Sequence, residues 1–444
     1  MTVLAHTDHD AVVVGGGVGG LAAAAELVLA GRRPLLLEQS DRLGGRFSTI
    51  EKDGYRLPTG AVAIETAGPF YEMFGRLGID ADLRVPDPPV MIHVRGRNLQ
   101  PGAAVWKHMM KRVTKAAGAV AEGLSKARSG SDEGSETLEH WVLQYTKSKT
   151  LLSLFQSLAA SIFTVNADEL PASAFFRLLR ETGGYKSFGY APRGNRELAD
   201  AIGEAIVERG GEVRLSTCVE AVRMAEGQAD AVLARGPGGQ AEWLPTRAVI
   251  SNAGPRATAR LFAETPAADD FARRVSDVAP SSMLALAFST QEPVVEPPGI
   301  WAFTDTQRMC NLANLTATCP ELAPEGRSLY EAYSVPRPSV GGNFDVEQER
   351  KLLEQDLLKF VPGFAGAETV LFKVMRGDVP AQQCRPGYDP DIVTPVGNVL
   401  DVGDGVKPYG WIGTTACAET ARRAVEQLLS GALASPSGVE RVVA

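Results

Sequence analysis

Three glycines and a carboxylate near the start of the chain have a spacing that suits nucleotide phosphates. Gly15, Gly17 and Gly20 follow the pattern G-x-G-x-x-G, and Glu38 comes roughly twenty residues after the last of them. The first glycine allows a tight turn, the second lets the backbone approach a pyrophosphate, and the third lets a helix pack closely on a strand. A carboxylate at Glu38 accepts the hydroxyls of a ribose and repels a 2′-phosphate. The pattern therefore predicts a site for FAD or NAD rather than NADP.

Short apolar strands and an alanine-rich helix surround these residues in the order that such a site needs. The strand from Ala11 to Val14 leads directly into the glycines, and the helix that follows runs from Leu21 to Ala30. A second apolar strand, from Pro34 to Leu37, ends at Glu38. The free N–H groups and the positive dipole end of the helix N-terminus face the phosphates. We therefore expect an anion to bind here without a basic side chain.

Composition narrows the class of protein. The chain has 444 residues, of which 44% are apolar. This length exceeds that of a usual sheet-centred domain, so two interleaved domains are expected. The net charge of −8 argues against nucleic acid, which needs a concentrated basic face. The five cysteines show no C-x-x-C pair and no signal peptide is recognisable before the first strand, so we expect reduced thiols in a cytoplasmic protein. No grouping of metal ligands is visible, and no metal is expected.

A second glycine turn follows the second strand. Gly44, Gly45 and Arg46 place two glycines and a cation where a longer cofactor would run. This segment resembles the double-glycine motif of the FAD-dependent amine oxidase and phytoene desaturase superfamily. The resemblance implies that the three residues contact the pyrophosphate of FAD. From the residues alone, the alternative interpretation, a helix-capped surface turn with an incidental arginine, remains open.

Two further segments resemble cofactor contacts of the same superfamily. The bend at Gly60 and Ala61 corresponds to one that lies along the flavin ring, although Pro58 and Thr59 replace the acidic residue that often precedes it. Val219 stands where the superfamily has a valine whose backbone lies against the adenine end. The resemblance therefore implies that Gly60, Ala61 and Val219 bind the cofactor.

The closing motif lies near the other end of the chain. Gly403 and Asp404 end a short apolar strand, and Ile412 and Gly413 open a helix. In the superfamily, this aspartate binds the ribityl or phosphate region. The helix N-terminus faces the flavin N1 and C2 oxygen, where its N–H groups stabilise negative charge. The resemblance implies that all four residues bind FAD, and non-covalent binding is expected because no cysteine or histidine lies between Gly403 and Gly413.

The resemblance extends over the whole chain, strongly at both ends and loosely between them. It implies an α/β fold in which a Rossmann-like FAD-binding domain is interleaved with an α+β substrate domain of mixed sheet and helices. We expect the FAD-binding domain to comprise residues 1–65, 186–260 and 391–444. The substrate domain is expected to comprise residues 66–185, largely a helical insertion, and 261–390, which supply its sheet.

The same resemblance implies an enzyme in which flavin N5 takes a hydride from the substrate. The stretch from Arg376 to Gly387 resembles the desaturases, and the middle of the chain is rich in aliphatic residues and phenylalanine. C–C dehydrogenation of an apolar organic substrate is therefore favoured, with reoxidation by oxygen, a quinone or a protein partner. Amine oxidation is the alternative, because Tyr409 and Trp411 stand where an aromatic cage would be, although both could equally pack the closing loop. A non-catalytic flavin-binding protein is a third hypothesis.

A basic amphipathic helix is predicted for residues 105–124, with Trp106 on its apolar stripe. Such a helix can lie in a membrane interface, so peripheral membrane contact is one interpretation. Packing against its own protein is the other. The expected partner is a small apolar substrate, and the sequence indicates no oligomeric state.

Overall fold

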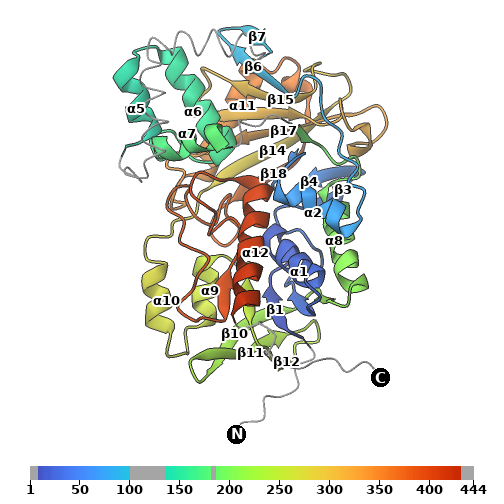
Figure 1. The fold of residues 1–444 in the computed structure, drawn as a ribbon. Helices are drawn as coiled ribbons and strands as arrows, with labels where there is room; N and C mark the ends of the chain where they lie inside the picture. The colour runs from blue at the N-terminus through green and yellow to red at the C-terminus, as the bar shows by residue number, and fades with distance from the viewer. Residues whose placement is uncertain (1–8, 101–135, 182–186, 432–444) are drawn as a thin grey trace.

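The computed structural model describes residues 9–100, 136–181 and 187–431 in two lobes (Figure 1). The predicted helix at residues 105–124 lies outside these ranges. One lobe is built on a five-stranded parallel sheet and the other on a seven-stranded mixed sheet. The chain passes between the lobes several times, so each lobe combines segments that are far apart in the sequence.

The five-stranded sheet has the order β19-β13-β1-β2-β9, and every strand pair in it is parallel. Its strands are β1 (Ala11–Val14), β2 (Pro34–Leu37), β9 (Glu212–Arg214), β13 (Val249–Ser251) and β19 (Val399–Asp401). Four of them are buried along their whole length. Parallel strands covered on both faces need continuous apolar runs, which is the pattern seen in the sequence.

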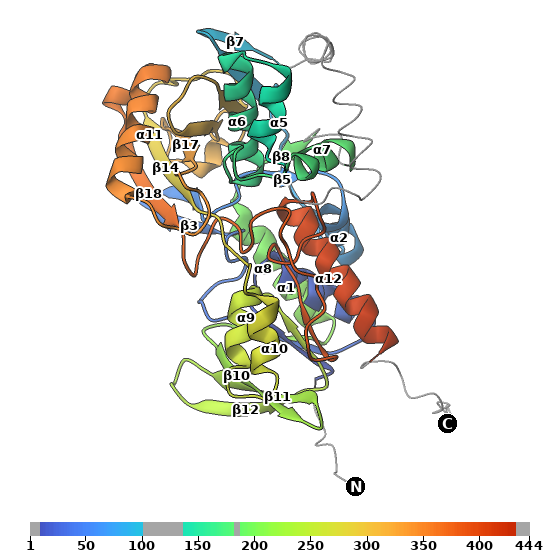
Figure 2. The same ribbon diagram turned by 90° about the vertical axis from the view of Figure 1, so that its left-hand side faces the viewer.

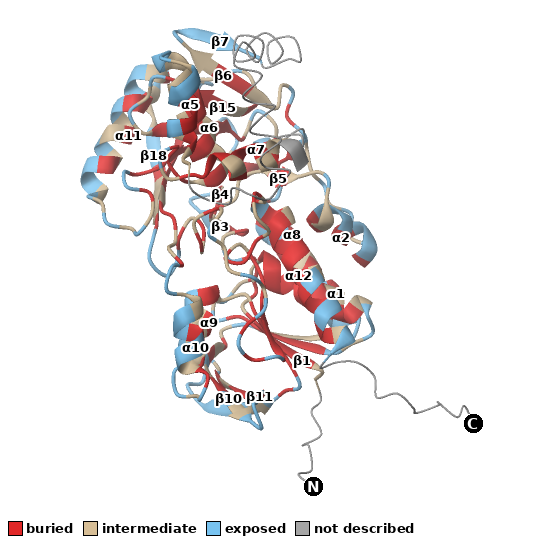
Figure 3. Cartoon of the chain, turned by 60° about the vertical axis from the view of Figure 1, so that its left-hand side comes forward, coloured by how far each residue is buried: buried red, intermediate tan, exposed pale blue. Residues whose placement is uncertain are grey.

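Helices cover one face of this sheet, and helices with a small sheet cover the other. The first face carries α1 (Val18–Leu29), α2 (Pro69–Leu77), α8 (Asn195–Glu208) and α12 (Gly413–Ser430). The second carries α9 (Pro255–Leu261), α10 (Ala268–Arg274) and the antiparallel strands β10 (Cys218–Ala225), β11 (Gln228–Arg235) and β12 (Ala241–Pro245). Figure 3 shows buried residues along one face of α8 and along most of α12, as expected for helices that cover a sheet.

Two helices pack in a different lobe from the one that the predicted boundaries give. Residues 66 and 261 were expected to begin substrate-domain segments. However, Phe70 and Phe74 of α2 belong to the core cluster of α1 and α12. Phe262 and Phe271 stack with ring centroids 4.2 Å apart in the core below the parallel sheet. The helices α2 and α10 therefore extend the cofactor lobe. Their apolar faces cover surfaces of that lobe, and the sequence does not reveal which surface a helix covers.

The seven-stranded sheet has the order β18-β14-β17-β16-β15-β6-β7. Its strands are β6 (Val90–Val94), β7 (Arg97–Leu99), β14 (Met283–Thr290), β15 (Gly299–Phe303), β16 (Met309–Asn314), β17 (Ser328–Ser334) and β18 (Glu368–Met375). In Figure 2, α11 (Val346–Phe360) covers one face, and α5 (Leu138–Tyr145), α6 (Lys149–Phe163) and α7 (Ala172–Glu181) lie on the other side. All pairs are antiparallel except β15 with β6.

Short elements join the lobes. The hairpin of β3 (Thr49–Lys52) and β4 (Tyr55–Pro58) and the pair of β5 (Ile64–Glu65) and β8 (Phe188–Gly189) lie between the two sheets. Single 3-10 turns occur at η1 (Pro320–Leu322) and η2 (Phe364–Gly366). All five cysteines are free thiols. A search of the described helices finds none with both the length and the apolar character needed to cross a membrane.

Candidate active site

A cavity of about 1680 Å³ lies where the two lobes meet. The glycine turns of the parallel-sheet lobe line one half, which we call the cofactor half. The helices α6 and α7 and one face of the seven-stranded sheet line the other, which we call the substrate half. Ligand pockets usually measure about 300–1,000 Å³. The cavity is therefore large enough for a dinucleotide and a second molecule together.

The two glycine turns hold each other in place at the floor of the cofactor half. Gly44 N donates to Gly16 O at 2.8 Å, so the second turn is fixed to the first. Gly15 has a φ of +93°, in the left-handed region that favours glycine. A Cβ on Gly20 would lie 1.9 Å from Gly15 O, so only glycine lets α1 approach β1 this closely. The spacing seen in the sequence thus has a local steric cause.

Glu38 braces these turns from the end of β2. Its carboxylate accepts from Gly16 N at 2.6 Å and from Ser40 N at 2.8 Å, and its side chain lines the cavity. The residue is only 7% exposed. Glu38 therefore fixes the glycine loop and presents its negative edge to the cavity, which is where a ribose would bind.

Two helix N-termini open on the same cavity. α1 begins at Val18 and α12 at Gly413, and residues of both first turns line the cavity wall. Neither N-terminus is capped by a side chain within the described part of the chain. Uncapped N–H groups and a positive dipole end favour an anion. The glycine cradle, the two free N-termini and the cavity volume together fit the pyrophosphate and flavin of FAD.

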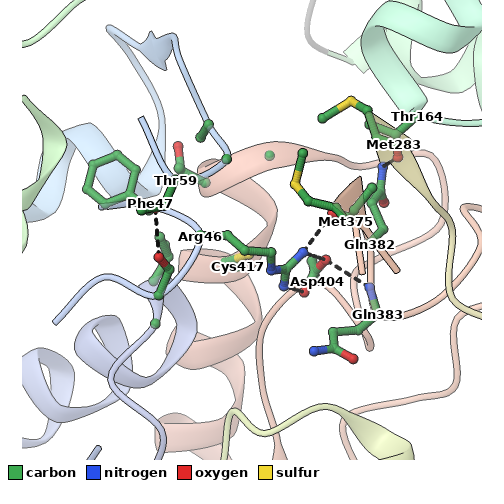
Figure 4. A pocket seen from close by; sticks show the side chains of 18 of the residues that line it. Arg46, Phe47, Thr59, Thr164, Met283, Met375, Gln382, Gln383, Asp404 and Cys417 are labelled. Atoms are coloured by element: carbon green, nitrogen blue, oxygen red, sulfur yellow. Dashed lines mark hydrogen bonds and ion pairs between the residues drawn. The ribbon is translucent and has the colours of Figure 1, made fainter. Parts of the chain in front are cut away.

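An ion pair joins the second glycine turn to the closing motif (Figure 4). The Arg46 guanidinium donates to both oxygens of Asp404, at 2.8 and 2.6 Å, and to Ala381 O at 2.7 Å. Gln383 N donates to Asp404 at 3.1 Å. Burial alone would raise the pKa of Asp404, but the Arg46 charge and these hydrogen bonds hold that pKa below its usual value. The pair is thus ionised and fixed at the cavity wall.

Most residues that the sequence predicts as cofactor contacts do line the cavity. They are Gly15, Gly17, Glu38, Gly44, Gly45, Arg46, Gly60, Ala61, Val219, Asp404 and Gly413. Gly20 and Gly403 instead permit close packing: a Cβ on Gly403 would come 2.4 Å from Asn252 Oδ1. Ile412 is buried in the core of the α5–α7 helices. Their contribution is to place the turns rather than to form the cavity surface.

The two aromatic candidates for the substrate site lie away from the cavity. Neither Tyr409 nor Trp411 is among the described residues of its wall. The Tyr409 hydroxyl hydrogen-bonds Ser173, and the Arg177 guanidinium lies 5.7 Å from the centre of the tyrosine ring. Trp411 N donates to Pro408 O at 2.9 Å. The Tyr409 side chain therefore contacts α7, and a role of Tyr409 or Trp411 on the substrate side stays a prediction.

The substrate half has a mostly apolar wall. The helices α6 and α7 contribute Leu151, Leu154, Phe155, Leu158, Ile162, Phe175, Phe176 and Leu179. The facing sheet contributes Val90, Ile92, Ile300, Ala302, Ala313, Met283 and Met375. Such a surface excludes water and favours an apolar ligand through the hydrophobic effect.

A polar cluster on the sheet was missed by the sequence analysis. Lys373 Nζ donates to Glu331 Oε1 at 2.7 Å and to the carbonyl of Pro58, and Tyr333 OH donates to Gly60 O at 2.8 Å. These bonds tie β17 and β18 to the bend at Pro58 and Gly60. The signal in the sequence was a glutamate between the two tyrosines of strand β17, since a buried carboxylate needs a cation.

Asn252 is a second missed residue. It follows β13 at the carboxyl end of a parallel strand, the edge at which ligands of such sheets bind. A Cβ on Gly17 or Gly19 would meet the Asn252 amide at 2.7 or 2.5 Å, and the residue lines the cavity. Its position after a buried strand was the available signal.

One carboxyl group stands at the border of the two halves. Glu65 lines the cavity and accepts a hydrogen bond from Thr414 Oγ1 in the first turn of α12. Burial raises the pKa of Glu65, with the Thr414 hydrogen bond opposing that shift. The group is therefore more readily protonated than an exposed glutamate.

Comparisons with known proteins agree with this geometry. The sequence profile of the family described as flavin containing amine oxidoreductase matches residues 18–429. A phytoene desaturase (neurosporene-forming) of Rhodobacter capsulatus is 26% identical over 278 residues, which cover 55% of this chain and 52% of that protein. The first curated relatives match over only 14 to 17% of their own length.

Solved structures share the fold over nearly the whole chain. An oxidoreductase from Methanosarcina mazei has a TM-score of 0.83 at 23% identity, covering 94% of this chain and all of that one. Putrescine oxidase bound to putrescine has a TM-score of 0.70 at 15% identity, covering 95% and 99%. At these identities the likeness shows the architecture, which is a Rossmann-like cofactor domain interleaved with an α+β substrate domain.

The profile match and the cavity point to one cofactor. The profile spans the helix after the first glycine turn, the second glycine turn and the closing helix, and the two turns form a cradle that fits a dinucleotide. The cofactor is FAD, and the chain belongs to the flavin containing amine oxidoreductase family.

Proposed function

We propose that the protein is an FAD-dependent oxidoreductase that dehydrogenates a C–C bond of an apolar organic substrate, with oxygen, a quinone or a protein partner as final electron acceptor. The observation that carries this proposal is the apolar wall of the substrate half, which α6, α7 and the sheet build around a cavity larger than one cofactor needs. Bound FAD would supply the acceptor for a hydride from a substrate C–H bond. A flavin protein without a substrate has no use for that extra volume.

The residues of the chain have separate tasks in this reaction. Phe155 and Phe175 keep water out of the substrate half, since they pack in the core of the helical roof while facing the cavity. Lys373 and Tyr333 hold the bend at Gly60, which is expected to run along the flavin ring. Hydrogen bonds therefore hold the sheet of the substrate half to the bend that is expected to lie along the flavin ring. This connection positions the reacting C–H bond relative to the ring.

The curated relatives support the C–C assignment. The relative with the long alignment is named a phytoene desaturase, and other short matches are to a carotenoid 3,4-desaturase and a phytoene dehydrogenase. These names describe desaturation or dehydrogenation. The free cysteines further support a cytoplasmic location as part of the proposal.

Amine oxidation is the second candidate, and Glu65 favours it. A carboxylate in a cavity that phenylalanine side chains also line suits recognition of a cationic amine. The fold is also that of putrescine oxidase. The raised pKa of Glu65 weakens this reading, because burial disfavours the carboxylate charge that would attract a cation.

An anaerobic reduction assay separates the two. Purified protein with bound FAD is mixed with amines, cyclic ketones or isoprenoid hydrocarbons, and loss of the yellow absorbance is recorded. We expect bleaching by an apolar substrate, unchanged in Glu65→Gln and in the control Glu72→Gln, an exposed residue of α2. Bleaching by amines that Glu65→Gln abolishes and Glu72→Gln does not would establish amine oxidation instead.

A further inference from the structure

One row of residues crosses the substrate sheet from a charged end to an apolar end. Strand pairing sets the consecutive neighbours Lys373, Ala285, Tyr333, Asn311, Ala302 and Ile92 on β18, β14, β17, β16, β15 and β6. Facing residues of paired strands have Cβ atoms about 4.5–5.5 Å apart. Asn311 therefore lies one strand from Tyr333, whose hydroxyl reaches the bend at Gly60.

The side chain of Asn311 is buried and forms part of the cavity wall. The residue is 8% exposed, and its neighbours in the row are Tyr333 and Ala302. No hydrogen bond reaches its amide from any residue that the structure describes. The hydroxyl of Tyr333 is directed to Gly60 O instead. Asn311 thus presents an unused donor and an unused acceptor to the substrate half.

Such an amide can find a hydrogen-bond partner only in the cavity, from a ligand or from water. Buried polar side chains are nearly always hydrogen-bonded, because transfer from water without a partner is unfavourable. The surrounding wall is apolar: Ala302 and Ala313 flank Asn311 on the sheet, and Leu158 lies on the facing helix. A polar residue in the middle of this wall therefore has the features of a recognition position.

A hydroxyl lies close to the Asn311 position. Ser161 of α6 lines the cavity and donates to Cys310 O at 3.2 Å, the carbonyl next to Asn311 in the chain. Because the hydroxyl proton is used there, Ser161 offers only oxygen lone pairs to a ligand. The amide and the hydroxyl mark one polar point along an apolar channel.

We propose that Asn311 hydrogen-bonds a hydroxyl or carbonyl oxygen of an otherwise apolar substrate. This inference rests on the proposed function, since it concerns the same cavity, and it narrows the substrate class from hydrocarbons to apolar molecules with one neutral oxygen group. That oxygen binds in the middle of the wall, one strand from Tyr333. Asn311 is a specificity-determining residue and takes no part in bond breaking.

A neutral oxygen suits the position better than an ammonium ion. The carboxylate nearest in the sheet pairing, Glu331, lies opposite Ala313 and is already paired with Lys373 at 2.7 Å. An amide alone compensates a cation poorly in an apolar wall. The amide can donate a hydrogen bond to a carbonyl oxygen. With a hydroxyl group it can either donate or accept.

Binding to the oxidised holoenzyme tests the proposal without turnover. The probes are 2-dodecanone and 2-methyl-1-dodecene, which differ in replacing C=O by C=CH₂. Dissociation constants come from calorimetric titration, with the change in FAD absorbance as a second signal. We expect the ketone to bind about tenfold more tightly or better, the usual size of one hydrogen bond to a site built for it. In Asn311→Val the ratio should fall to about one.

A matched control removes general effects of packing. Leu312→Val changes the next residue of β16, which faces the α11 side of the sheet, and should leave the ratio at its wild-type value. Asn311→Thr, which keeps a hydroxyl, should restore part of the preference. A wild-type ratio near one, a preference that survives in Asn311→Val, or no saturable binding of either probe would overturn the proposal. If amines alone bleach the flavin while the ketone preference holds, the proposed C–C reaction fails and the role of Asn311 stands.

Discussion

The two halves of the cavity are built in opposite ways. In the cofactor half, backbone atoms touch backbone atoms: the turn at Gly44 is bonded to Gly16, and Gly20 lies against Gly15. In the substrate half, side chains from α6, α7 and several strands meet across the sheet. The cofactor half therefore allows few substitutions, whereas the substrate half can change residue by residue. One family can keep its cofactor and change its substrate for this reason.

The largest expected effect lies in the cofactor half, at the ion pair. Arg46→Met leaves the Asp404 carboxylate partly buried without its cation, since the two side chains are only 29% and 14% exposed. We expect the free energy of unfolding to fall by about 3 kcal/mol or more. Urea denaturation of the holoenzyme measures it. The double variant Arg46→Met, Asp404→Leu should recover much of the loss, because it removes the unpaired charge.

The pH dependence of that loss follows from the sign of the pKa shift. In the wild type the pKa of Asp404 lies below its usual value, so the pair stabilises the protein above about pH 4 and this stability is lost as the pH falls further. Without Arg46, burial raises the pKa of Asp404. The carboxylate of the variant therefore takes up a proton as the pH falls, which removes the unpaired buried charge. The difference between the two proteins should shrink from pH 7 toward pH 4. A difference that is constant with pH would contradict the ion-pair explanation.

A glycine pair gives the next largest effect. Gly20→Ala places a Cβ 1.9 Å from Gly15 O, and we expect a loss of about 3 kcal/mol in unfolding free energy. Gly75 of α2 is the matched control, because it is exposed with nothing within 4 Å of its added Cβ. Gly75→Ala should stabilise the protein by about 0.5–1 kcal/mol through helix propensity. Equal effects of the two changes would mean that the close approach of α1 to β1 is not a constraint.

This contrast explains how much could be predicted from the sequence. Gly15, Gly44 and Gly20 are required by backbone geometry within a few residues, so their spacing is visible in one chain. Asn311 and Tyr333 become neighbours only through the pairing of β16 with β17, which no local pattern specifies. The fold class and the cofactor half could therefore be predicted, while the wall of the substrate half could not.

The helices that pack across the predicted domain boundaries illustrate the same limit. An apolar stripe such as that of α2 indicates that a helix packs, but it does not indicate against which surface. Tyr409 was placed by its distance from the closing helix in the sequence. In the structure the loop before α12 turns it toward Ser173 of α7. In both cases the missing information was a contact between distant segments.

A smaller effect in the cofactor half is expected at Glu38. Glu38→Ala removes the acceptor of Gly16 N and Ser40 N and any acceptor for a ribose, and FAD binding should weaken by about 1–3 kcal/mol. Flavin retention on dilution, followed by fluorescence, measures this loss. Glu38→Gln keeps the shape and one carbonyl oxygen and should lose less. Unchanged retention in both variants would remove Glu38 from the cofactor site.

In the substrate half a single change should be mild. Ile300→Val removes one methylene group from the wall of the cavity and should lower the free energy of unfolding by about 1 kcal/mol or less. FAD retention should stay at the wild-type value, because Ile300 contacts neither glycine turn. Thermal unfolding and flavin content measured on one preparation test both statements. Loss of FAD in this variant would show that the two halves are not independent.

The smallest expected effect concerns Cys417, a thiol that lines the cavity and could in principle form a covalent bond to FAD. It lines the cavity in α12 and lies beside Arg46 and Asp404 (Figure 4). A thiol attacks as the thiolate, and burial raises the pKa of Cys417, with the Asp404 charge adding to the shift. The thiol is therefore neutral at physiological pH and a weak nucleophile, so FAD should remain non-covalent. Acid precipitation should release all of the yellow colour from the wild type, and Cys417→Ser should release the same amount. Colour that stays in the wild-type pellet but not in the Cys417→Ser pellet would show a thioether link, and the cofactor half would then hold FAD by a bond as well as by its backbone.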